Sequence, residues 1–141
     1  MPARTARRFA ATTAAITLLV LAALQLAQAA DVPYVTGPGG QFVGYTIPVF
    51  ALPAGSTMTL VNVDIPQHDV IATTFGPDSN TWCAEQEFEI GRCPVFWSPL
   101  IGLGAQAPVY GVEALPAGGI YAFYCSIHSA MDGTLVVLPA V

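Results

Sequence analysis

The stretch FYCSIHSAMDG, residues 123–133, places a cysteine, a histidine and a methionine three residues apart. The whole chain has only three cysteines, two histidines and three methionines, so Cys125, His128 and Met131 concentrate rare side chains in one short segment. Thiolate, imidazole and thioether groups are ligands of transition metals. The segment is therefore either a terminal strand and loop with three unrelated side chains, or it supplies three ligands of one metal.

The composition around this segment favours short strands. The chain is 54% hydrophobic and 9% charged, with 13 glycines and 12 prolines separating segments rich in aromatic and β-branched residues. Glycine and proline punctuate strands more readily than they fit into long helices. Strands are predicted at residues 41–50, 57–63, 69–75, 109–114, 119–126 and 134–138.

Two of these segments carry a clear face pattern. Met58, Leu60 and Asn62 share one face of the 57–63 segment, as in a half-buried strand. The 119–126 segment is apolar on both faces, which predicts a central strand. We therefore expect an all-β, Greek-key β-sandwich of seven to eight strands, with residues 76–107 as a long irregular connection between the two sheets.

The N-terminus has the features of an export signal. Arg4, Arg7 and Arg8 precede an apolar stretch that ends in Ala-Gln-Ala, so we expect a signal peptide at residues 1–29 with cleavage after Ala29. The protein would then be exported, to the periplasm or the extracellular space. The alternative is an uncleaved segment that anchors the protein to the membrane, because residues 9–30 are almost long enough to span a bilayer.

Cleavage would leave a strongly acidic domain. Arg92 would be its one basic residue against nine acids, a net charge of −8. Nucleic acid is excluded as a partner, because phosphates require a basic face. Nothing in the sequence indicates an oligomer, and we expect a monomer.

The odd number of cysteines makes one of them special. Cys83 and Cys93 would close a short loop, and an oxidising compartment favours a disulfide between them. Two alternatives remain at this point: the pair could bind a second metal with nearby glutamates, or Cys125 could take one of them as its partner. If Cys83 and Cys93 pair, Cys125 is a free thiol, which in such a compartment is a liability unless it is buried or occupied.

A copper site would use the free thiol. Two imidazoles and a thiolate in a trigonal arrangement, with a long axial thioether, make a blue-copper site. His68 is the one remaining histidine, so it would be the fourth ligand beside Cys125, His128 and Met131. The competing interpretation is that the histidines are ordinary surface residues, that Met131 packs in a loop and that Cys125 is a structural cysteine.

Residues 124–137, YCSIHSAMDGTLVV, resemble the C-terminal copper loop of the cupredoxins of the plastocyanin, pseudoazurin and amicyanin kind. The shared pattern is Cys-x2-His-x2-Met followed by glycine and a final hydrophobic strand, matched by Cys125, His128, Met131 and Gly133. The upstream segment VNVDIPQHDV, residues 61–70, is similar to the context of the family's first histidine and places His68 there.

The resemblance implies that residues 30–141 form a cupredoxin-like domain holding one type 1 copper ion. It implies His128 as the ligand nearest the surface and the electron port, Met131 as the ligand that tunes the potential, and Ile127, Ala130 and Pro66 as a docking patch. The family commonly has asparagine after its first histidine, where this chain has Asp69. That acid would either lower the reduction potential or bond Ser126, and residues 76–107 match no part of the pattern.

Three functions follow as hypotheses. The first is an electron carrier between exported or membrane-bound redox partners, whose identity the sequence does not give. The second is a protein that stores or delivers copper without a redox circuit. The third is a metal-free β-sandwich binding module held by disulfides. We do not expect an enzyme, because two histidines cannot also build the additional copper centres of copper oxidases and nitrite reductases.

Overall fold

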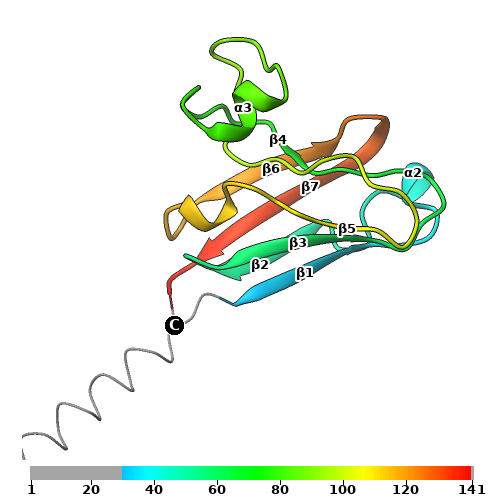
Figure 1. Ribbon diagram of the computed structural model, residues 1–141. Helices are drawn as coiled ribbons and strands as arrows, with labels where there is room; N and C mark the ends of the chain where they lie inside the picture. The colour runs from blue at the N-terminus through cyan, green and yellow to red at the C-terminus, as the bar shows by residue number, and fades with distance from the viewer. Residues whose placement is uncertain (1–29, 141) are drawn as a thin grey trace, which may run out of the picture.

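The computed structural model describes residues 30–140, so the predicted signal peptide lies outside the described residues. Seven strands form two mixed sheets packed as a sandwich (Figure 1), which confirms the predicted fold class. One sheet has the order β1-β3-β5, with β1 at Asp31–Thr36, β3 at Thr57–Asn62 and β5 at Gln106–Pro108. The other has the order β2-β7-β6-β4, with β2 at Val49–Pro53, β4 at Ile71–Ala72, β6 at Ile120–Cys125 and β7 at His128–Leu138.

The helices are short and lie outside the sheets. In the part of the chain that the structure describes they are α2 (Gly40–Val43), α3 (Thr81–Glu85) and the 3-10 helix η1 (Val112–Ala114). Within residues 30–140, no helix is long and apolar enough to cross a membrane. Three predicted strands are corrected here: the 41–50 segment begins as helix α2, the 69–75 segment keeps only Ile71–Ala72, and the 109–114 segment contains η1.

The face pattern of β3 is as predicted, and that of β6 is only partly so. Met58, Leu60 and Asn62 are all buried along β3. Strand β6 is central, lying between β7 and β4, but only one of its faces is covered. Phe123 and Cys125 point inward, whereas Ile120 on the other face is 70% exposed. The other face of β6 is therefore apolar but exposed, so the prediction that both faces are covered was wrong.

Aromatic rings from both sheets fill the core. Tyr34 of β1 packs edge-on against Phe50 of β2 at 5.0 Å between ring centroids, and against Phe123 of β6 at 5.6 Å. Tyr45 adds a fourth ring, 5.1 Å from Phe123. Such tilted pairs add to the free energy of burying the rings themselves. This cluster joins the two sheets close to Cys125, because Phe123 lies on β6 two residues before Cys125.

The 76–107 connection is more ordered than predicted. It carries α3, and Cys83 and Cys93 form a disulfide, which confirms the predicted pair and leaves Cys125 free. Trp82 and Trp97 each stack with Tyr110, at 6.4 and 6.1 Å between ring centroids. Helix α3 stands off the sandwich at the top of Figure 1, while α2 lies at one end of it.

Candidate metal centre

The turn between β6 and β7 presents two of the predicted ligands. Strand β6 ends at Cys125 and β7 begins at His128, and the two residues face each other in the antiparallel register. A shift in register between Tyr124 and Cys125 makes this junction irregular. The result is that the Cys125 Sγ and His128 Nδ1 atoms lie 3.5 Å apart.

His68 reaches the same point from the loop that follows β3. Its backbone pairs with Ile101, with N–H···O distances of 3.0 and 2.9 Å. The buried Asn62 side chain holds this arrangement by donating to the carbonyls of Pro66 and Ile101, at 2.8 and 2.9 Å. The His68 ring is completely buried, and its Nδ1 lies 3.9 Å from Cys125 Sγ.

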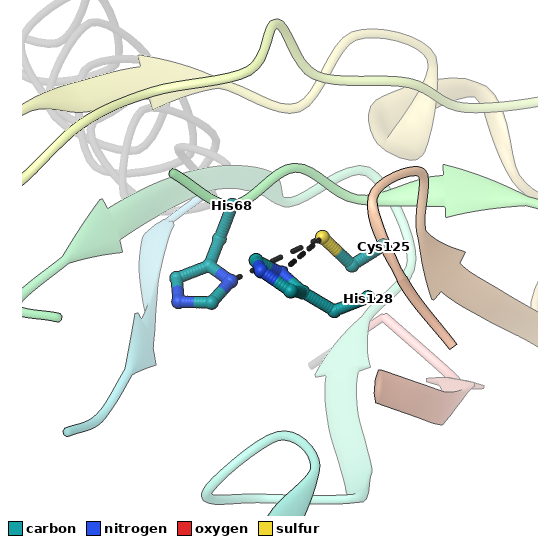
Figure 2. Close-up of side chains that lie close together, drawn as sticks. All are labelled: His68, Cys125 and His128. Carbon is teal, nitrogen blue, oxygen red and sulfur yellow. Dashed lines mark hydrogen bonds between the residues drawn. The ribbon is translucent and has the colours of Figure 1, made fainter. Parts of the chain in front are cut away.

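The three donor atoms converge on one point, as Figure 2 shows. His68, Cys125 and His128 each offer a ligand atom within 4.8 Å of the others, and the two imidazole rings are 4.9 Å apart between centroids. A metal about 2.0 Å from nitrogen and about 2.3 Å from sulfur, at angles between tetrahedral and trigonal, requires N···S separations of roughly 3.5–3.7 Å. The 3.5 Å between His128 Nδ1 and Cys125 Sγ lies in this range, and the 3.9 Å between His68 Nδ1 and Cys125 Sγ is slightly longer.

Met131 lies at the same end of the sandwich. It is completely buried in β7, three residues after His128. A Cβ atom added to Gly40 of α2 would meet Met131 Sδ and Asp64 Oδ2, both at 3.5 Å. The methionine thus packs against Gly40 of α2, whose N–H bonds to the acid that contacts His68.

The comparisons with known proteins bear on the fold. Neither protein-family models nor curated proteins give a match to this chain. Among solved structures, a reduced tryptophan-to-tyrosine variant of amicyanin matches with a TM-score of 0.52 at 18% identity, covering 76% of this chain and 81% of that one. Dithionite-reduced auracyanin from Roseiflexus castenholzii matches with a TM-score of 0.52 at 21% identity, covering 79% of this chain and 100% of that one.

The chain has the cupredoxin fold. Cysteine, histidine and methionine occupy the end of this cupredoxin sandwich where the predicted loop lies. The donor set of one thiolate, two imidazoles and a nearby thioether suits copper, since soft sulfur favours Cu(I) and imidazole suits both oxidation states.

Asp69 ties together the two segments that carry His68 and the Cys125–His128 turn. Its carboxylate accepts hydrogen bonds from the Ser126 backbone N–H at 2.7 Å and from the Ser126 hydroxyl at 2.5 Å. Its own carbonyl accepts a hydrogen bond from the Tyr45 hydroxyl at 2.5 Å. Of the two roles predicted for Asp69, the bond to Ser126 is therefore present.

The environment of Cys125 disfavours a free thiolate. Burial raises the pKa of the Cys125 thiol, although hydrogen bonds from the backbone N–H groups of Ile127 and Asp69 act in the opposite direction. A negative sulfur in this position needs a cation beside it. The three-donor cluster offers a place for one.

Sequence reasoning missed one acid of this site. Asp64 Oδ2 lies 3.1 Å from His68 Nε2, on the side of the ring opposite Cys125. The one feature of the sequence that could have indicated this contact is that Asp64 lies four residues before His68. That spacing indicates a contact in a helix, whereas the 63–70 segment is not helical, so only the folded loop reveals the pair.

Proposed function

We propose that this protein is a type 1 copper protein that passes single electrons between exported or membrane-bound redox partners. One observation carries the proposal: the Cys125 sulfur and two imidazole nitrogens lie within 4.8 Å of one another at one end of a sandwich with the cupredoxin fold. His68 and His128 would bind copper through Nδ1 and Cys125 through Sγ, and Met131 would supply the fourth ligand. The copper would supply the one-electron couple, and the chain would hold its ligands in one arrangement for both oxidation states.

The number of histidines supports a carrier over an enzyme. The sequence has two histidines, and both belong to the cluster. No histidine is left for a second copper centre, so we propose no catalytic role for the chain.

His128 is the ligand we propose as the electron port. It is partly exposed, whereas His68 and Cys125 are buried. Exposed apolar side chains lie on the segments around it, with Ile127 at 52%, Ile65 at 85% and Phe42 at 79% exposure. Such a surface suits a weak and short-lived protein contact, and Ala130 and Pro66 would extend it.

The test is a visible and EPR spectrum of the mature domain with one equivalent of Cu(II). An electron carrier should show an intense thiolate-to-copper band and reversible one-electron cycling. The Cys125→Ser variant should lose the band. A protein that only stores or delivers Cu(I) would be colourless and would release the metal to a competing chelator. Finding Cys125 in a disulfide by mass spectrometry would refute both copper functions.

A further inference from the structure

Asp64 is the acid that faces the buried histidine. Its Oδ2 atom lies 3.1 Å from His68 Nε2, and the two side chains are 6% and 0% exposed, respectively. The opposite nitrogen of the same ring, Nδ1, faces Cys125 Sγ at 3.9 Å. The imidazole therefore lies between a carboxylate and the proposed metal position.

The carboxylate is held in place by several donors. Its Oδ2 atom also accepts a hydrogen bond from the Gly40 N–H at 2.9 Å, and its Oδ1 atom accepts one from the Ile65 N–H at 2.9 Å. Each carboxylate oxygen thus accepts a hydrogen bond from a backbone N–H group, so the side chain acts as an acceptor in this loop.

A carboxylate acceptor at Nε2 determines where the proton of the ring lies. A neutral imidazole carries one proton, and a carboxylate can only accept a hydrogen bond. The proton is then on Nε2, which leaves the lone pair on Nδ1, the nitrogen that faces Cys125. A simple loop-capping role explains the Oδ1 bond to Ile65 but not the Oδ2 contact with His68.

We propose that Asp64 is a positioning residue of the copper centre, which holds His68 as an Nδ1 ligand and lowers the reduction potential. This inference rests on the proposed function. Partners on the far nitrogen of a metal-binding histidine fix its tautomer and raise its basicity. A buried negative charge near the metal also favours the more positive oxidation state, because the surrounding protein screens it less than water would.

The first test compares reduction potentials of the wild-type copper protein, Asp64→Asn and Asp132→Asn. Asp132 is an exposed acid of β7, one residue after Met131, and it serves as a control for loss of a nearby charge. Asp64→Asn should favour Cu(I) over Cu(II) by tenfold or more, which is a rise of about 59 mV for a one-electron couple. Asp132→Asn should change the ratio less than threefold. Equal shifts in the two variants would overturn the proposal.

The second test uses the wild-type protein and does not depend on a variant that folds. In the diamagnetic Cu(I) form with 15N-labelled histidine, NMR should show a proton on His68 Nε2 that exchanges more slowly than the His128 ring proton. A proton on His68 Nδ1, or equal exchange of the two, would refute the role of Asp64. A wild-type protein without the thiolate–copper band would instead refute the proposed function, so the two failures are distinguishable.

Discussion

At the scale of single residues, Asp69 contributes in two ways that different substitutions can test separately: through its negative charge and through its hydrogen bonds. Both carboxylate oxygens are bonded to Ser126, so the side chain is a structural tie between the ligand loops as well as a negative charge beside them. Cupredoxins of the kind this chain resembles commonly have a neutral asparagine here. The difference is one charge close to the proposed copper.

Asp69→Asn should raise the reduction potential, because it removes the charge and keeps an oxygen for the Ser126 N–H. The measurement is a redox titration of the copper protein. Ser126→Ala is the matched control: it leaves the charge and removes one hydrogen bond, at a cost of about 1 kcal/mol in the free energy of unfolding. An unchanged or lower potential in Asp69→Asn would show that the charge does not act on the metal.

Gly133 is a second residue whose identity follows from one contact. It is paired with Phe123 across β6 and β7, and a Cβ atom there would lie 2.3 Å from Phe123 Cζ. We expect Gly133→Ala to lower the free energy of unfolding by about 1–3 kcal/mol, since the ring must move within a packed core. Unfolding by denaturant measures this change in the free energy of unfolding. Gly102→Ala, with open space around its Cβ position, should stay within about 0.5 kcal/mol of wild type.

At the scale of elements, the end of β3 decides where His68 lies. Asn62 is the last residue of that strand, and its buried amide group bonds to Pro66 and Ile101 while its Oδ1 atom accepts from the Asp64 N–H at 2.8 Å. One side chain thus connects the loop carrying both His68 and Asp64 to the 76–107 connection. The sequence pattern placed Asn62 on the buried face of β3 but could not show what it bonds.

Asn62→Ala should therefore damage both stability and the metal site. Leaving buried carbonyl and N–H groups unsatisfied costs about 1–3 kcal/mol each, so we expect a loss at least in that range. Thermal unfolding and Cu(II) affinity are the measurements. Thr57→Ala, at the exposed start of the same strand, should change neither by a comparable amount. Full copper affinity in Asn62→Ala would mean that the Ile101 pairing alone positions His68.

The glycines that flank α2 explain why its residues were predicted as part of a strand. Phe42 and Val43 are apolar and suit a strand, but Gly39 and Gly44 on either side have φ angles of 82° and 89°, which are not strand conformations. The Gly40 N–H then bonds to Asp64 from a different loop. The local sequence pattern carries no information about this contact with Asp64, and so it could not predict the helix.

At the scale of the whole molecule, the disulfide loop and the candidate metal centre are separate units. Cys83 and Cys93 close the loop that carries α3, whereas the proposed ligands lie in the β6–β7 turn and the loop after β3. The connection between them is held independently, because Ser98 and Ile101 donate backbone hydrogen bonds to the carbonyls of Val70 and His68, at 2.9 Å each.

The double variant Cys83→Ser, Cys93→Ser should lose stability and keep the copper site. Opening a loop of this size costs about 3 kcal/mol or somewhat less in the chain-entropy model. Calorimetry should show a lower Tm, while the visible band and the potential stay at their wild-type values. Loss of the band in a variant that is still folded would show that the loop supports the centre.

The sequence by itself determined the class of the fold and the position of most donor residues. Cys125 and His128 are separated by a two-residue turn, so any hairpin there brings them together, and alternating apolar residues predicted which face of β3 points inward. Tertiary structure alone decided the approach of His68 and the contact of Asp64 with its far nitrogen. Both depend on hydrogen bonds between segments that are distant in the chain, such as Asn62 to Ile101, and no local pattern encodes such partners.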